Sequence, residues 1–178
     1  MWFKIRAMKK FFIAKTLLIK RMIASFSFRR KLMAHEDAGN YAAKHPAGRK
    51  PLDSVQESVQ SSAKNGTITC VAAHRIAESC GTSPAEVGFT IDYNEYRITR
   101  CQLGLFGYAP EKRLVTPAET VSEELEKILR SSLNEKGRLT CSRAWEIAAA
   151  QGMKRIDISA ACEKLEIRIT ACQLGAFR

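Results

Sequence analysis

Residues 66–106 read GTITCVAAHRIAESCGTSPAEVGFTIDYNEYRITRCQLGLF, and residues 137–177 read GRLTCSRAWEIAAAQGMKRIDISAACEKLEIRITACQLGAF. The second stretch follows the first at a constant shift of 71 positions without a gap, and 16 of the 41 aligned positions are identical. The identities are clustered, most densely in the shared ending Arg-Ile-Thr-x-Cys-Gln-Leu-Gly-x-Phe. This period is longer than the roughly 20–50 residues typical of solenoid repeats. The sequence therefore predicts two small units related by duplication.

The charge of the chain is unevenly distributed. The 178 residues carry a formal net charge of +11, yet residues 1–32 hold ten Lys or Arg and no acid, whereas residues 33–178 hold 19 bases and 18 acids. The basic character therefore belongs to an N-terminal arm. It does not by itself indicate a nucleic-acid-binding face on the repeats.

The basic arm, residues 1–32, contains only short apolar pieces. None approaches the roughly 18 residues that span a bilayer or the about 7–15 residues of a secretory signal core, so we expect a cytoplasmic protein without a transmembrane segment. Three interpretations of the arm remain: a basic amphipathic segment that touches anionic lipid or nucleic acid, a disordered tail, or translated upstream sequence with the true start at Met33. The loss of charge bias at Met33 favours the last. Residues 33–50 are predicted to be a flexible segment.

Four of the six cysteines are matched between the repeats: Cys70 and Cys101 correspond to Cys141 and Cys172. The chain has no Cys-x-x-Cys, and its three histidines do not have the spacing of zinc ligands, so we expect no structural metal and no cofactor. In a reducing compartment these cysteines are expected to be free and to pack as small apolar side chains. The alternative is a thiol switch or a shared metal in each unit, formed by the thiol pairs Cys70 with Cys101 and Cys141 with Cys172.

Each unit is predicted to open with a helix. In the second unit the TPAE motif at 116–119 has the form of a capping box, and an apolar stripe then continues towards Gly137. The first-unit equivalent, residues 52–63, is weaker and rich in serine. Short β-prone stretches follow at 67–70 and 138–141, and alternating stretches at 96–101 and 167–172 predict a second short strand in each unit.

Between these strands each unit carries the spacing of a helix-turn-helix. The pattern is Ala77-x-x-x-Gly81 with Val87 in the first unit, and Ala148-x-x-x-Gly152 with Ile158 in the second. A small Ala admits a crossing helix, Gly permits the left-handed turn, and the branched residue anchors the second helix. The SPAE motif at 83–86 supplies a capping box for the second helix of the first unit, whereas the second unit lacks one.

The order helix, strand, helix, turn, helix, strand resembles the winged helix-turn-helix superfamily over residues 51–108 and 117–178, with residues 109–116 as a linker. The resemblance implies a mainly α fold with small β-strands (α+β), built from two tandem winged-helix-like units. Because only nine residues follow Ile169, the wings must be reduced. We therefore expect the shared ending to be a tight turn with Gly104 and Gly175 at positive φ, and Phe106 and Phe177 to fold back onto the core.

The resemblance implies that the second helix of each unit contacts DNA. The candidate DNA-binding residues are Thr90, Tyr93, Arg97 and Arg100 in the first unit, and Lys154, Arg155, Ser159, Lys164 and Arg168 in the second. The first-unit helix is the poorer reader, because Glu86 and Asp92 repel phosphate and Phe89 is more typical of a protein contact. Arg97, Arg100 and Arg168 lie on the last strands, where they suit contacts to backbone phosphate or remain solvated charges.

Two functions follow from this sequence. The first is a DNA-binding protein, a small transcriptional regulator that uses tandem helix-turn-helix units. The alternative is a protein-protein interaction module, in which the first-unit helix packs its apolar side chains against its twin in a homodimer or against another subunit: Val87, Phe89, Ile91 and Tyr93. We expect no enzymatic activity, because the chain has no phosphate-binding Gly-rich loop, Gly-x-Ser-x-Gly or His-Glu-x-x-His.

Overall fold

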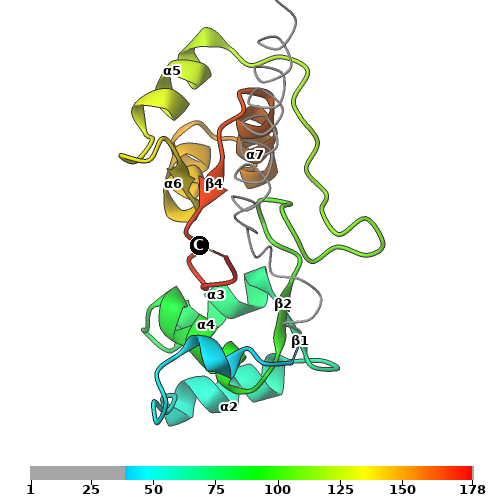
Figure 1. Cartoon of the computed structure of the whole chain (residues 1–178), viewed down its shortest axis with the longest axis vertical. Helices are drawn as coiled ribbons and strands as arrows, with labels where there is room; N and C mark the ends of the chain where they lie inside the picture. The colour runs from blue at the N-terminus through cyan, green and yellow to red at the C-terminus, as the bar shows by residue number, and fades with distance from the viewer. Residues whose placement is uncertain (1–38, 178) are drawn as a thin grey trace, which may run out of the picture. The chain divides into compact units, whose positions relative to one another are not determined.

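The computed structural model describes residues 39–177, and Asp37–Arg178 form one compact unit (Figure 1). The fold of this unit is mainly helical with a few short strands, so the expected α+β class is confirmed. The predictions for residues 1–32 fall outside the described residues.

The two repeats have matching element orders. The first contains the short 3-10 helix η2 (Ala42–Lys44), α2 (Asp53–Ser62), β1 (Thr67–Thr69), α3 (Cys70–Ser79), α4 (Pro84–Tyr93) and β2 (Arg97–Thr99). The second contains α5 (Glu123–Ser131), β3 (Leu139–Thr140), α6 (Cys141–Ala150), α7 (Arg155–Lys164) and β4 (Ile169–Thr170). Helices α6 and α7 begin and end 71 positions after α3 and α4. The predicted order helix, strand, helix, turn, helix, strand is therefore confirmed in both units.

Local capping explains where the helices begin. The Thr69 hydroxyl accepts a hydrogen bond from the Ala72 amide at 3.2 Å, and the Thr140 hydroxyl accepts one from the Arg143 amide at 3.2 Å. Each threonine thus ends a strand and caps the next helix, so that the following cysteine is the first helical residue. The predicted cap of α4 is also confirmed, because the Ser83 hydroxyl accepts from the Glu86 amide at 3.2 Å.

The predicted start of the first helix of the second unit is wrong. Helix α5 begins at Glu123, where the Ser122 hydroxyl accepts from the Leu125 amide at 3.3 Å, and it ends at Ser131. The TPAE motif lies instead in a segment without regular secondary structure, and its Ala118 amide donates to the Ala160 carbonyl at 3.0 Å. Two cap signals compete here. The helix begins after Ser122 because this start places three acidic residues in the first turn, where the helix dipole stabilises negative charge.

The strands form one two-stranded parallel pair in each repeat. Thr67 to Thr69 of β1 lie opposite Arg97 to Thr99 of β2, and β3 is paired with β4 in the same way. Parallel strands need a long crossover, which α3 and α4 or α6 and α7 supply. A wing requires a second strand after the last helix, and none follows β2 or β4 within residues 39–177 as part of the same unit. The coarse α+β architecture therefore holds, whereas the pairing differs from that of a wing.

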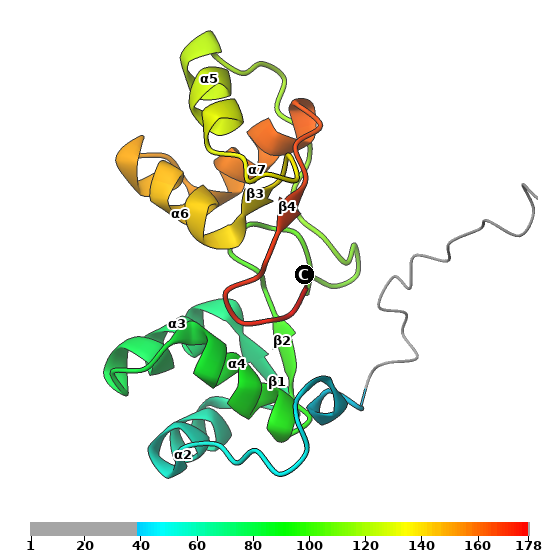
Figure 2. The ribbon, with the colours of Figure 1, turned by 60° about the vertical axis from the view of Figure 1, so that its left-hand side comes forward.

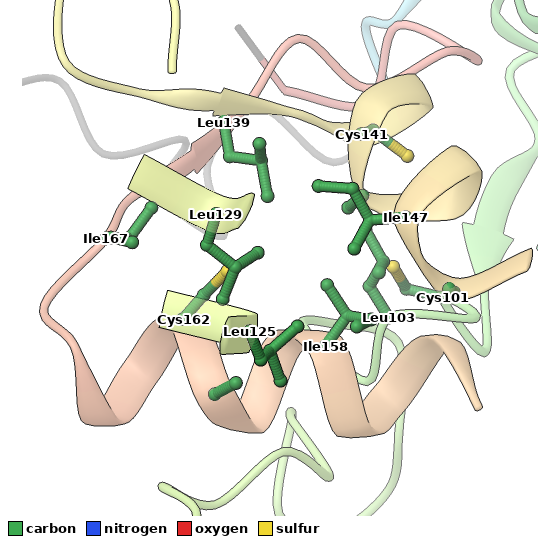
Figure 3. Packing of buried hydrophobic residues seen from close by; sticks show 13 residues of the cluster. Cys101, Leu103, Leu125, Leu129, Leu139, Cys141, Ile147, Ile158, Cys162 and Ile167 are labelled. Carbon is green, nitrogen blue, oxygen red and sulfur yellow. The ribbon is translucent and has the colours of Figure 1, made fainter. Parts of the chain in front are cut away.

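The shared ending of each repeat packs into the core of the other repeat. Leu103, which is fully buried, lies in the cluster formed by Leu125, Leu129, Leu139 and Ile158 of the second repeat; Figure 3 shows it among these side chains. Leu174 lies in the cluster formed by Val55, Ile68, Val87 and Ile91 of the first repeat. In Figure 2 the segment after β4 runs back beside α3 and α4. Phe106 packs against the clusters of both repeats, so its expected return onto its own core is confirmed, whereas the leucine of each ending enters the core of the other repeat.

The tight turns of the two endings are as predicted. Gly104 and Gly175 have φ angles of +72° and +74°, in the left-handed region that glycine adopts without a Cβ penalty. The rings of Phe106 and Phe177 meet edge to face, with centroids 5.9 Å apart. The two endings therefore contact each other as well as the opposite cores.

Candidate functional site

Helix α4, the expected DNA-reading helix of the first unit, is largely enclosed. Six of its ten residues are buried: Val87, Gly88, Phe89, Thr90, Ile91 and Asp92. The Thr90 hydroxyl is fully buried and donates to the Glu86 carbonyl at 2.9 Å, so Thr90 cannot contact a base edge. Only Tyr93, of the four residues expected to form an apolar protein contact, is exposed. The helix therefore presents no apolar face to a twin.

Residues 41–49, here called the α4 strap, cover the outer side of α4. The amides of Tyr41 and Ala42 donate to the Glu95 carboxylate at 2.7 and 3.0 Å. Lys44 Nζ and His45 Nε2 each lie 2.8 Å from Asp92 Oδ2. This segment was predicted to be flexible, but the structure places it against the helix.

The C-terminal end of the α4 strap adds a further contact. The Arg49 guanidinium lies 2.5 Å from the Glu86 carboxylate and 3.9 Å from the centroid of the Phe89 ring. The acids that would repel phosphate are thus neutralised by cations from the same chain. The consequence is that the helix cannot enter a groove while the strap is in place.

We expect Asp92→Asn to release the α4 strap without unfolding α4. Asp92 is 3 % exposed and contacts the Lys44 ammonium and the His45 imidazole, and hydrogen bonds to charged groups contribute about 1.5–3 kcal/mol each. Amide hydrogen exchange of residues 42–45 should accelerate, whereas exchange in the core of α4 should stay slow. Asp157→Asn, at an exposed position of α7, is the control and should leave both regions unchanged. Unaltered exchange of residues 42–45 in Asp92→Asn would contradict the role of this carboxylate.

Helix α7 is covered in a similar way by the segment that precedes the second unit. Arg113 lies 3.4 Å from the Glu163 carboxylate, and the Ala118 amide bonds the Ala160 carbonyl. Ser159 is fully buried, and its hydroxyl donates to the Arg155 carbonyl at 3.3 Å. The prediction that Ser159 contacts DNA therefore fails for the same reason as for Thr90. Lys154 and Lys164 are exposed.

Arg155, also a predicted DNA contact, points towards the first repeat. Its guanidinium lies 3.4 Å from the centroid of the Trp145 ring, and its Nη1 donates to Gln102 Oε1. The Trp145 ring in turn packs on His74, with centroids 4.3 Å apart. Burial, followed by the nearby Arg155 charge, lowers the pKa of His74, so that this imidazole is neutral at neutral pH. Arg155 therefore joins the two repeats.

The four matched cysteines, here called the thiol seam, lie where the two repeats exchange their endings: Cys70, Cys101, Cys141 and Cys172. Gln102 Nε2 donates to Cys70 Sγ at 3.8 Å, and the equivalent Gln173 Nε2 donates to Cys141 Sγ at 3.6 Å. Cys101 shares a core cluster with Cys141, and Cys172 packs against the cluster that contains Cys70. Each repeat therefore places one of its matched cysteines in or against the core cluster of the other repeat.

All six cysteines are free thiols. Burial is the main cause that raises the pKa of Cys70 and Cys141, and it raises the pKa of Cys101 to about 11. Thiols of the seam add to this effect, since Cys172 raises the pKa of Cys70, and Cys70 and Cys141 raise that of Cys101. Cys70, Cys101 and Cys141 are therefore protonated at neutral pH and are poor nucleophiles. Within residues 39–177, no group of three or more His, Cys, Asp or Glu side chains stands at ligand positions for a metal ion.

A second set of functional candidates lies at the strand ends. Arg97 is on β2, and Arg100 follows it with a φ of +49°. In the second repeat Arg168 directly precedes β4 and is adjacent to Arg138, whose neighbour Leu139 donates its amide to the Arg168 carbonyl at 3.1 Å. Six basic residues lie on or beside the ends of these strands, and we call them the strand-end cations: Lys64, Arg97, Arg100, Lys136, Arg138 and Arg168.

The strand-end cations are available to solvent. Arg138 is half-buried, and the other five are exposed: Lys64, Arg97, Arg100, Lys136 and Arg168. None of the set forms an ion pair with an acid of the described chain, residues 39–177. Arg100 also lines an open depression together with Val71, Thr99, Gln102 and Tyr108. Arg97, Arg100 and Arg168, which were predicted from the sequence, thus remain candidates for binding an anion.

Sequence reasoning missed Gln102, Gln173 and the α4 strap. The identity of both glutamines in the two repeats was a usable signal, because each stands next to a matched cysteine. Among the described residues, no helix has the length and apolar character needed to cross a membrane. Comparisons with protein-family models, with curated proteins and with solved structures found no match.

Proposed function

We propose that this chain is a DNA-binding regulatory protein that contacts phosphates through the strand-end cations of both units, and not by inserting α4 or α7 into a groove. The observation that supports the proposal is a contrast in availability. The strand-end cations are solvent-accessible and have no acidic partner among residues 39–177, whereas α4 and α7 are covered by other segments and the candidate hydroxyls of Thr90 and Ser159 are buried.

The near-neutral charge of residues 33–178 does not oppose this mode of binding. Acids Glu86, Asp92 and Glu163 are paired with cations from the covering segments, so their repulsion of phosphate is reduced. Contacts from Lys and Arg to phosphate supply affinity with little sequence discrimination. We therefore expect binding that depends strongly on salt and weakly on base sequence.

Fluorescence anisotropy with duplex DNA over a salt series tests the proposal. Residues 33–178 should bind without the basic arm. The triple variant Arg97→Ala, Arg100→Ala, Arg168→Ala should lower the slope of log K against log salt by about 0.9 for each phosphate that is no longer neutralised, or about 2–3 in total. The control removes three exposed cations elsewhere: Arg75→Ala, Lys112→Ala and Lys127→Ala. Equal reductions in the two triple variants would show that only net charge matters and would overturn the assigned interface.

The alternative, a protein-protein interaction module, rests on a different observation. The second helix of each helix-turn-helix unit is contacted by other segments of the chain: the α4 strap and the Leu174 ending lie against α4, and Arg113 and the Gly104 turn lie against α7. If residues 33–178 bind no DNA at low salt, the repeats are assembly modules. Any binding by the full chain then comes from residues 1–32.

A further inference from the structure

We propose that the thiol seam is a metal site, in which Cys70, Cys101, Cys141 and Cys172 together bind one thiophilic centre between the two repeats, either a zinc ion or an iron–sulfur cluster. A set of four thiolates is the ligand set that both centres share. The inference is independent of the proposed DNA binding.

The strand register brings the two cysteines of each repeat together. Thr69 lies opposite Thr99 at the end of the parallel pair, and Thr140 lies opposite Thr170. Parallel strands leave a sheet at the same edge, so Cys70 and Cys101, which follow these positions, emerge side by side. The same holds for Cys141 and Cys172. Each repeat thus presents one thiol pair at one end of its sheet.

The exchange of endings joins the two thiol pairs. Because Leu103 enters the core of the second repeat, Cys101 packs in the cluster that contains Cys141. Because Leu174 enters the core of the first repeat, Cys172 packs against the cluster that contains Cys70. The four thiols are within electrostatic reach of one another across the two repeats, because Cys172 raises the pKa of Cys70 and Cys141, and Cys70 and Cys141 raise the pKa of Cys101. Neither repeat alone provides this arrangement.

Burial favours the neutral thiols, but hydrogen-bond donors and helix N-termini beside the sulfurs act in the opposite direction and favour thiolates. Cys70 and Cys141 are the first residues of α3 and α6, where the helix dipole favours negative charge. Gln102 and Gln173 direct side-chain amides at these two sulfurs, and main-chain amides of Leu103 and Leu105 donate to Cys101. Donors to sulfur of this kind tune metal–thiolate centres. In the protein without metal, burial outweighs them, and a bound cation would remove that penalty.

The other two cysteines lie apart from the seam and differ from it. Cys80 packs beside Ser58, with Sγ and Oγ 3.6 Å apart, and Cys162 lies inside the core of the second repeat. Neither has a counterpart in the other repeat. Because only the four seam cysteines are matched between the repeats and gathered at their boundary, we assign the metal site to them.

Binding of a zinc ion needs no oxidant, and an iron–sulfur cluster would take its ferric and ferrous iron, with sulfide, from solution. Each of the four S–H bonds loses its proton to solvent and a metal–sulfur bond forms, so one divalent ion releases four protons. The sulfurs do not stand at ligand positions in the metal-free chain, but each cysteine can move its sulfur between three staggered positions by rotation about a single bond. Affinity should rise with pH, because the ligands bind as thiolates.

The first test is a titration of the reduced full chain with Co²⁺ under argon, followed by competition with Zn²⁺. A second arm supplies equal amounts of ferrous and ferric iron together with sulfide, so that a cluster can form without a further oxidant. We expect a thiolate-to-metal charge-transfer band that saturates at one centre per chain, in one of the two arms, with proton release. Saturation at half a centre per chain, or no band in either arm, would overturn the proposal.

Single variants separate ligands from packing. Cys101→Ala and Cys172→Ala should each weaken metal binding by more than about 100-fold, which exceeds the effect of outer-shell changes, while Gln102→Ala should weaken it by about 10–100-fold. Cys80→Ser is the control and should bind as the unaltered chain does. Circular dichroism identifies the variants that fold, and Cys141→Ser replaces any that does not. Full metal binding by a folded seam variant would rule out the four-cysteine site.

Discussion

Leu174→Ala is expected to lower the free energy of unfolding by about 2–5 kcal/mol, the range for truncating a fully buried leucine. The location of the destabilisation shows which core contains the Leu174 side chain. Leu174 belongs to the second repeat in sequence, but its side chain is 1 % exposed within the core of the first. Amide hydrogen exchange should therefore accelerate in α2, α3 and α4 more than in α5 and α6.

The reciprocal change supplies the matched comparison. Leu103→Ala removes a fully buried side chain from the core of the second repeat, so exchange should accelerate mainly in α5, α6 and α7. Leu133→Ala, a partly buried leucine packed on its own repeat, should have a smaller and local effect. If each leucine instead affected only the repeat that contains it in sequence, the exchange of endings would be wrong.

The elements of each repeat were predictable because their causes are local. Thr69 and Thr140 cap the helices that begin at the adjacent cysteines, and Ser83 caps α4 as its motif indicates. Gly104 adopts the positive φ that its turn requires. In each case the deciding partners lie within a few residues of each other, so sequence patterns carry the information.

The placement of the candidate site depends on contacts that local patterns do not encode. The apolar side chain of Leu103 would fit the core of either repeat, and the sequence does not indicate which of the two cores it enters. Thr90 and Ser159 have suitable donors for DNA, but their burial depends on the strap, the linker and the exchanged endings. The helix start predicted from the TPAE motif was wrong for a related reason. The Ala118 amide donates a hydrogen bond to the Ala160 carbonyl, which is distant in sequence, and this contact holds the motif outside the helix.

The exchange also explains how units of this size form stable cores. A domain of about 60 residues buries a smaller fraction of its surface than a larger one and is correspondingly marginal. Here each unit completes the core of the other with a leucine and brings its cysteine pair to the shared boundary. Stability and the thiol seam therefore depend on the same contact.

Gly88→Ala is expected to break that contact at one point. A Cβ at position 88 would lie 2.1 Å from the Leu174 carbonyl oxygen and 2.7 Å from its carbonyl carbon, and backbone atoms cannot move aside as a flexible side chain can. Alanine favours helix by about 1 kcal/mol over glycine, yet overpacking of this kind costs about 1–3 kcal/mol or more, and the displaced ending also removes Leu174 from its core. We therefore expect a net destabilisation of at least about 2 kcal/mol in urea unfolding, since the burial of Leu174 adds to the overpacking cost.

The position equivalent to Gly88 provides the control for this prediction. Ser159 occupies it in α7 with a side chain already present, so Ser159→Ala removes only a hydroxyl bonded to the Arg155 carbonyl and should cost about 1 kcal/mol. Limited proteolysis adds a local readout, since Gly88→Ala should expose the segment after Ile169 to cleavage while Ser159→Ala should not. A Gly88→Ala protein that is as stable as the unaltered chain, with the ending still protected, would mean that Leu174 does not lie against α4, because the physical clash at this glycine leaves no room for both.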